Sequence, residues 1–316
     1  MTSRQGIQVG QTYDKAKSFS EHNLGRLREA VKPHIPTDAI IATFGSYARR
    51  EASDLSDIDY VIISNDISSL SRPSEEVEKA IKSIVEIEPS PDGAFGKVIQ
   101  RSEILKNLGG DQDSNQSLTR RLLLLLEGEW LAGEAHFKEL RRELIERYVA
   151  ATKRDHQLAL FLLNDIIRYW RTMTVDYMYK TTEASKPWAI RNIKLVFSRK
   201  LMYASGLFSV AMTADRSEAA KVDILEKLFE MPALDRLCYI CGDARFSNAF
   251  SCYELFLSQI DSSDVRDRLK KIETDDHSDP IFRKLKNEGH HFTRELLSLF
   301  EQTFHATHPI RRAVMF

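Results

Sequence analysis

Hydrophobic positions recur at two different spacings along the chain. Up to about residue 115, helical and strand-like patterns alternate. An apolar stripe at helical spacing covers 13–31, a β-branched apolar run covers 39–44, and a second strand-like run covers 57–63. Residues 74–85 return to helical spacing, and the alternation of Val85-Glu-Ile-Glu88 predicts a third strand.

From about Leu118 the pattern becomes helical throughout. Amphipathic stretches cover 118–132, 135–150, 155–180, 187–205 and 216–230, and several more extend to about residue 304. A glycine-rich polar loop over 109–115 separates the two parts. We therefore predict an α+β fold, with a small mixed-sheet head at 1–117 and an all-helical C-terminal body at 118–316.

Composition narrows the classes of partner. Hydrophobic residues make up 42% of the 316, enough for an ordinary core, and the formal net charge is −1. Long nucleic acid is therefore disfavoured, and an anionic substrate would need a local basic patch. No apolar run approaches the roughly 20 residues of a membrane helix, and the start of the chain lacks the apolar middle of a signal peptide. We expect a cytoplasmic protein without a membrane partner.

The three cysteines do not indicate a disulfide framework, because they are few and odd in number. Cys238-x-x-Cys241 resembles half of a zinc site, but no second pair follows it. The same spacing within an apolar stretch is also one face of a helix, which is the interpretation we favour.

Asp57 and Asp59 are the residues that first indicate chemistry. Two residues apart on a predicted strand, they point to the same face, where their carboxylates repel each other unless a cation lies between them. Magnesium prefers such oxygen ligands and keeps substrate phosphates in its shell. The alternative for the aspartates alone is a solvated turn, since Ser-Asp-Leu-Ser-Asp also favours turns.

Gly45-Ser46 precedes the aspartates at a predicted strand-to-helix junction. Glycine lets the backbone approach a phosphate, and the serine hydroxyl and helix N-terminal amides can bind phosphate oxygens. The sequence from Gly45 to Asp59, with ten residues between Gly-Ser and Asp-x-Asp, resembles the signature of the DNA polymerase beta superfamily of nucleotidyltransferases. The residues of this motif are most similar to those of the uridylyltransferase of the PII signalling protein and its relatives.

This resemblance implies a metal-dependent transfer of an NMP group from an NTP to a hydroxyl acceptor, with release of pyrophosphate. ATP is the expected donor, and two Mg2+ ions are the expected cofactors. By the same resemblance, Asp57 and Asp59 are metal ligands, Gly45 and Ser46 bind phosphate, and Arg49 lies near the triphosphate. The alternative for Arg49 and Arg50 is exposed helix surface.

A third carboxylate on a neighbouring strand completes the metal site in this superfamily. Glu86 is our first choice as third metal ligand and catalytic residue, because it shares a face with Glu88 on the predicted third strand. Glu88, Asp111 and Asp113 are the alternatives. If none of the four reaches the metal ions, the domain would bind nucleotide without turning it over.

The body contributes a basic segment over 186–200. On a helix, Arg191 and Lys194 fall on one side, and helical domains of related transferases supply basic and aromatic groups to the nucleotide. We therefore expect Lys194, Arg191 and Tyr203 to contact the donor, with Trp170 or Trp188 beside the base. The alternative is an amphipathic helix with a solvated cationic face and tryptophans in the core.

The acceptor stays open at this point. A protein side chain, a tRNA end, a small molecule such as an aminoglycoside and a second nucleotide are all compatible with the sequence, and a protein or a nucleotide is preferred. The alternative function is a non-catalytic nucleotide-binding regulator or an interaction protein of the toxin–antitoxin type.

Overall fold

A single mixed sheet organises the N-terminal part of the chain. The computed structural model describes residues 10–68, 70–87, 96–151 and 157–315. In this range four strands form the sheet in the order β3-β2-β1-β4. They are β1 (Ile40–Phe44), β2 (Asp59–Ser64), β3 (Val98–Gln100) and β4 (Glu129–Ala132). β1 pairs antiparallel with both β2 and β4, whereas β2 and β3 are parallel.

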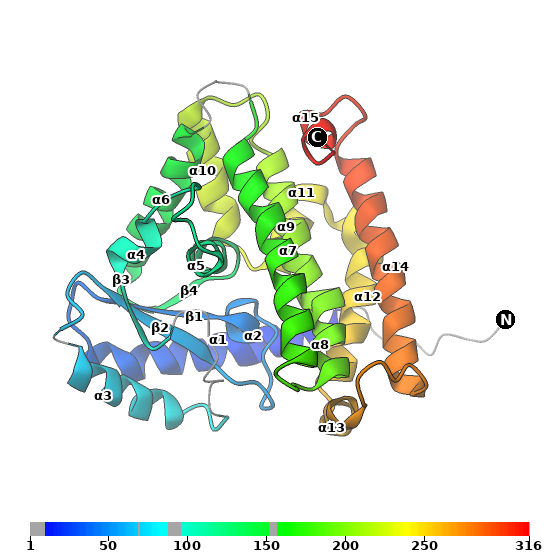
Figure 1. Cartoon of the computed structure of the whole chain (residues 1–316), viewed down its shortest axis with the longest axis horizontal. Coiled ribbons are helices and arrows are strands. Elements are labelled where there is room, and N and C mark those ends of the chain that lie inside the picture. The colour runs from blue at the N-terminus through cyan, green and yellow to red at the C-terminus, as the bar shows by residue number, and fades with distance from the viewer. Residues whose placement is uncertain (1–9, 69, 88–95, 152–156, 316) are drawn as a thin grey trace.

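Helices cover both faces of the sheet (Figure 1). The helices and the 3-10 turn of this part are α1 (Gln11–Val31), η1 (Lys32–His34), α2 (Gly45–Ala48), α3 (Ser71–Lys82), α4 (Arg101–Leu105), α5 (Asn115–Leu126) and α6 (Glu134–Ala150). Ile41 and Ile62 pack with Leu24 of α1 on one face. Ile40 and Ala42 point to the other face, toward α5 and α6, because successive side chains of a strand alternate.

The remaining helices form the body, which packs against α1, α5 and α6 of the N-terminal part. Its elements are α7 (Leu160–Thr182), α8 (Trp188–Lys194), the π-helical turn η2 (Leu195–Arg199), α9 (Lys200–Ala211), α10 (Glu218–Phe229), α11 (Ala233–Cys241), α12 (Asp243–Ile260), α13 (Ser263–Lys271), α14 (Pro280–Thr303) and α15 (Pro309–Ala313). One core cluster joins Phe44 of β1 to Phe197 and Phe292 of the body. The predicted α+β class, a mixed-sheet head followed by a helical body, is therefore confirmed.

The third strand was predicted at the wrong place. Residues 85–87 are not in a strand, and Glu88 lies outside the described residues. Val85, just after α3, is buried, while Ile87 is exposed. The alternation of apolar residues in the sequence therefore does not mark one face of a sheet. The strand beside β2 is β3, about a dozen residues further on, where Val98 pairs with Ile62.

A strand also occurs where helix alone was expected. β4 lies within 118–132 and pairs with β1, so the predicted boundary at 117/118 separates β4 from the rest of its sheet. α5 ends at Leu126, and a Cβ on Gly128 would lie 2.5 Å from the Leu124 carbonyl oxygen. This close approach allows the chain to turn from α5 into β4.

Two expectations about the chain as a whole can be compared with the described residues. Among the helices of the described ranges, none has the length and apolar character needed to span a membrane. Cys238 and Cys241 are free thiols on α11, as the helix-face interpretation requires. The cytoplasmic location stays a prediction.

Candidate active site

Gly45 and Asp59 meet at the edge of the sheet where β1 ends and β2 begins. Antiparallel pairing places Phe44 opposite Asp59, so the turn after Phe44 lies beside the start of β2. Gly45 has a φ of 75°, in the left-handed region that favours glycine. A Cβ at Gly45 would lie 3.4 Å from Oδ2 of Asp59. The Asp59 carboxylate therefore faces the corner that Gly45 and Ser46 form.

Asp57 and Asp59 form a pair of like charges at this corner. Ile58 between them is fully buried, while both aspartates are half-buried. The strand was predicted to begin at Asp57, but β2 begins at Asp59, so Asp57 lies in the loop before the strand. Burial and then the charge of Asp57 raise the pKa of Asp59 to about 6. Within the described residues neither carboxylate makes a hydrogen bond or ion pair. Such a pair provides a site where a cation is favoured.

Three cationic side chains of the body surround the two carboxylates. The charge of Asp57 acts on both Lys194 and Arg266, and the charge of Asp59 acts on Arg199. Arg266 of α13 also donates a hydrogen bond to the carbonyl oxygen of Leu55, in the loop that leads to Asp57. The body therefore brings positive charge to the point where an anionic substrate would meet the carboxylates.

Lys194 combines accessibility with an unusual environment. Its side chain is open to solvent, yet the protein groups around it remove much of the water that would stabilise the ammonium charge. This desolvation, followed by the charge of Arg266, lowers the pKa of Lys194 to about 8, while Asp57 acts in the opposite direction. A bound anion would favour the charged form.

A buried network connects the corner to the body. Arg49 Nε donates to Glu51 at 2.9 Å, and its Nη1 donates to Glu127 at 2.5 Å. Arg199 Nη1 donates to the other oxygen of Glu127 at 3.1 Å. The Tyr253 hydroxyl of α12 donates to Glu51 at 2.7 Å. Glu127 and Arg199 carry no signal in the sequence, because a glutamate after a leucine-rich helix and an arginine in a basic segment are typical of solvated surfaces.

The structure changes the interpretation of Arg49 and Arg50. Both side chains are buried, so the alternative of exposed helix surface is wrong. Arg50 donates to Glu21 of α1 and Glu129 of β4, which ties the corner to its neighbours. Glu51 and Glu127 bind two nitrogens of Arg49. Its charge opposes the rise in the pKa of Asp59 only as the smallest of several causes, of which burial is the largest. A triphosphate contact by Arg49 stays a prediction.

The third carboxylate is not found where we predicted it. Glu86 is exposed on the non-strand segment after α3, so the reason for choosing it, a shared strand face, is wrong. Glu88 lies outside the described residues, and Asp111 is exposed in its loop. Across the described ranges, no group of three histidine, cysteine, aspartate or glutamate side chains is arranged to hold a metal ion.

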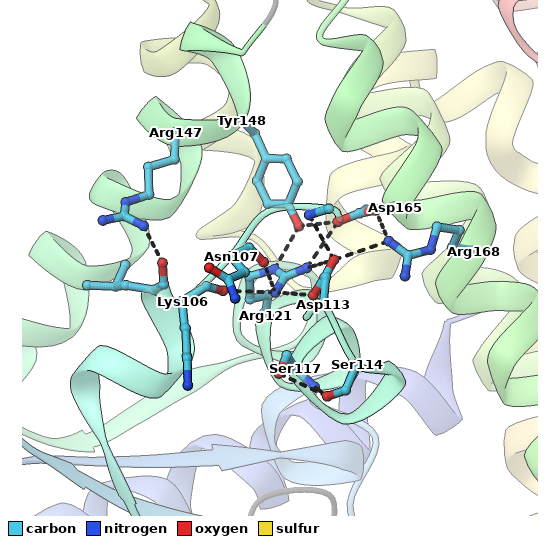
Figure 2. Close-up of polar contacts among 12 residues, drawn as sticks. Lys106, Asn107, Asp113, Ser114, Ser117, Arg121, Arg147, Tyr148, Asp165 and Arg168 are labelled. Atoms are coloured by element: carbon cyan, nitrogen blue, oxygen red, sulfur yellow. Dashed lines mark hydrogen bonds and ion pairs between the residues drawn. The ribbon is translucent and has the colours of Figure 1, made fainter. Parts of the chain in front are cut away.

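Asp113, the remaining alternative, belongs to a separate ion network (Figure 2). Its carboxylate accepts two hydrogen bonds from Arg121, both at 2.9 Å, and one from Arg168 at 3.2 Å. Asp165 of α7 also binds both arginines and accepts a 2.7 Å hydrogen bond from the Tyr148 hydroxyl. This network holds the 106–114 loop against α5, α6 and α7, so Asp113 has a structural role here.

The other residues of the body that were predicted to contact the nucleotide differ in their burial. Arg191 lies one turn before Lys194 on α8 and is half-buried, without an ion pair among the described residues. Trp188 is buried and packs on Phe282 at a ring-centroid distance of 4.8 Å, as the core alternative predicts. Trp170 and Tyr203 stack on each other at 5.4 Å. A role for these two at a nucleotide base stays a prediction.

An open groove of about 600 Å3 between α6 and α10 lies elsewhere on the molecule. Arg142, Glu146, Arg147 and Val222 are among its lining residues. None of its lining residues belongs to the corner or to the cations that surround it. The chemistry indicated by Asp57 and Asp59 therefore does not depend on this groove.

Comparison with known proteins agrees with the geometry of the corner. Residues 24–94 match the family model of the nucleotidyltransferase domain, and the match contains Gly45, Ser46, Asp57 and Asp59. A search of curated proteins finds no match to the chain. The domain supports NMP transfer in general, and the matched range ends before the helical body. Residues 24–94 of this chain are therefore similar to a nucleotidyltransferase domain.

Proposed function

We propose that this protein transfers an NMP group from an NTP, with ATP as the expected donor, to a hydroxyl acceptor and releases pyrophosphate. One observation carries this proposal: two carboxylates that have no ion-pair partner among the described residues lie at a glycine corner, where charges of the body act on them. Carboxylates, a glycine turn and cations together provide what a metal-bound triphosphate needs.

In this proposal, the phosphates bind to the Gly45–Ser46 corner and to the basic segment at 186–200. Gly45 would let the backbone approach a phosphate, and the half-buried Ser46 hydroxyl has no hydrogen-bond partner within the described residues. Lys194 would add a positive charge beside Asp57, and Arg191 lies on the same side of α8. Binding of a polyanion would relieve the repulsion between Lys194 and Arg266.

The carboxylate pair suits magnesium. Asp57 and Asp59 would each supply an oxygen ligand, and a bound cation would relieve the repulsion that contributes to the raised pKa of Asp59. Water and phosphate oxygens normally complete such a shell, so two protein carboxylates are enough to begin it. When bound, the ions would neutralise the charge that develops on the phosphates.

The proton of the acceptor hydroxyl has no assigned base. Glu86 was predicted for this role, but its exposed place after α3 gives no support for it. For the acceptor itself we propose a protein side chain or a second nucleotide, by resemblance of the Gly45–Asp59 motif to the PII uridylyltransferase group. The net charge of −1 weighs against long nucleic acid.

The test is transfer of label from α-labelled NTPs, each supplied with and without magnesium. A lysate serves as the source of acceptor, and pyrophosphate is measured in parallel. We expect label in a protein or nucleotide product only with magnesium and the wild-type chain. Absence of binding of every magnesium-NTP, measured by calorimetry with non-hydrolysable analogues, would remove the proposal.

A regulator that binds nucleotide without turnover is the second candidate. The observation that favours it is the absence of a three-carboxylate metal group within the described ranges. Such a protein would bind the same analogues with magnesium but would release no pyrophosphate with any acceptor source. Binding without turnover would therefore select the regulator over the enzyme.

A further inference from the structure

Glu127 is a buried carboxylate that holds two arginines with different surroundings. Its side chain is 1% exposed, whereas Arg49 is 9% and Arg199 38% exposed. Burial alone would raise the pKa of Glu127, but the charges of Arg49 and Arg199 outweigh it and lower the pKa. Glu127 is therefore a fixed anion, with a structural partner on one side and a partly exposed partner on the other.

The backbone on both sides of Glu127 is held by buried arginines. Arg236 of α11 donates to the Leu126 carbonyl oxygen at 2.9 Å, and Arg141 of α6 donates to the Gly128 carbonyl oxygen at 2.5 Å. Arg236 also binds the carbonyl oxygens of Leu228 and Met231 and the Ser205 hydroxyl, and within the described residues neither guanidinium group forms an ion pair with a carboxylate. This arrangement leaves Glu127 little freedom to move.

Arg199 lies between two anions. Glu127 accepts a hydrogen bond from Arg199 and another from Arg49, which follows the Gly45–Ser46 corner along the chain, and the charges of Arg199 and Asp59 act on each other. A guanidinium without another partner would be drawn onto Asp59 and would compete with a metal ion there. Glu127 binds Nη1 of Arg199, while within the described residues Asp59 forms no ion pair and the other N–H groups of Arg199 have no hydrogen-bond partner.

We propose that Arg199 binds the phosphoryl group that is transferred, and that Glu127 is a positioning residue that sets Arg199 at the required place. The inference rests on the proposed function, because it needs an NTP beside Asp57 and Asp59. The guanidinium has five N–H donors, so one pairing with Glu127 leaves donors for phosphate oxygens. An arginine of this kind stabilises the charge of a phosphoryl transition state.

The first test compares Arg199→Met and Arg199→Lys with wild type. We expect kcat to fall about 1,000-fold in Arg199→Met, with a much smaller change in the affinity for the magnesium-NTP analogue. Arg199→Lys keeps the positive charge but loses the planar set of N–H donors of the guanidinium group. This variant should bind the analogue like wild type, but its kcat should stay low.

The second test is a double-mutant cycle between Glu127→Gln and Arg199→Met. We expect Glu127→Gln alone to lower kcat about 100-fold, because Arg199 loses its fixed position. In the Arg199→Met background, the same change should have little further effect. Asp165→Asn is the matched control, since Asp165 is also a buried carboxylate that binds two arginines. It should lower the melting temperature without lowering kcat.

Several outcomes would overturn the inference. They are wild-type kcat in Arg199→Met, additive losses in the double variant, or equal kcat in Glu127→Gln and Asp165→Asn. If Glu127→Gln does not fold, Glu127→Asp replaces it in the cycle, since it keeps the charge and shortens the side chain. A wild-type chain that neither binds nor turns over any NTP rejects the proposed function together with this inference, whereas turnover that ignores Arg199 rejects the inference alone.

Discussion

Oδ2 of Asp59 lies 3.4 Å from the position that a Cβ would occupy on Gly45. This closeness follows from the pairing of Phe44 with Asp59, which places the end of β1 beside the start of β2. A residue with a side chain at 45 would reduce the space between the corner and the carboxylate. Gly45 and Asp59 are therefore close enough that a change in either one should affect the other.

Gly45→Ala is expected to weaken nucleotide binding and to lower stability. Its φ of 75° disfavours a Cβ, at a cost of about 1 kcal/mol, and the methyl group would face Asp59. Calorimetry with a magnesium-NTP analogue and urea unfolding measure the two effects. Gly25→Ala is the control, since Gly25 lies in α1 with open space around it and should gain stability. Unchanged affinity in Gly45→Ala would contradict the phosphate role of the corner.

The stability of the metal-free protein should depend on pH through Asp59. Its pKa is raised from 3.8 to about 6, so between these values the folded chain holds a proton that the unfolded chain releases. The contribution of Asp59 to stability should therefore fall as pH rises through this window, because the folded state must then carry an unfavourable charge. The difference between the melting temperatures of wild type and Asp59→Asn from pH 4 to pH 7 measures this fall, and Asp38→Asn, an exposed control, should follow wild type.

Magnesium should reverse this trend. A cation at Asp57 and Asp59 favours the ionised carboxylates, so added Mg2+ should raise the melting temperature more at pH 7 than at pH 5. The Asp59→Asn variant should lose the difference. Equal stabilisation of wild type and Asp59→Asn at pH 7 would place the ion elsewhere.

Nucleotide affinity should fall above about pH 8 through Lys194. Its pKa of about 8 means that the ammonium group loses its charge in that range, whereas a bound triphosphate favours the charged form. Lys194→Met should bind more weakly and with a flat pH profile, as calorimetry from pH 7 to pH 9.5 would detect. Lys200→Met is the matched control, because the pKa of Lys200 is also about 8 but its ammonium group bonds Thr293 instead of facing the aspartates.

Asp57→Asn and Asp59→Asn should each abolish NTP turnover while the fold remains intact. Each variant removes one charged ligand from a site whose effect is mainly positioning and charge neutralisation. Glu86→Gln should keep turnover, because Glu86 is exposed and lies on no strand. Pyrophosphate release and near-ultraviolet circular dichroism provide the two readouts. Loss of activity in a folded Glu86→Gln protein would restore Glu86 as the third carboxylate.

Asp113→Asn should lower stability by about 3 kcal/mol, because it removes the main carboxylate partner of the fully buried Arg121. Urea unfolding measures this loss. Turnover per folded molecule should stay at the wild-type level, since the Asp113 network holds the 106–114 loop and not the corner. A folded Asp113→Asn protein without activity would show that the network reaches the reaction.

The sequence by itself determined the parts of the site that depend on local geometry. Asp57 and Asp59 are half-buried on either side of the buried Ile58, although β2 begins only at Asp59, and the conformational freedom of Gly45 allows the turn beside them. Local pattern was insufficient for the third strand, since Val85 is buried without belonging to a sheet and β3 is too short to give a clear alternation. A four-residue alternation is compatible with a strand and with the end of a helix.

Only the tertiary structure decided which charges surround the aspartates. Glu127, Arg199 and Arg266 are far from Asp59 in sequence, and in isolation each is typical of a solvated helix surface. Packing of the body on β1 buries Glu127, which then requires cationic partners because an unpaired buried carboxylate is unstable. Short-range periodicity fixes the direction of a side chain, but the partner of a charge depends on which distant helix packs against it.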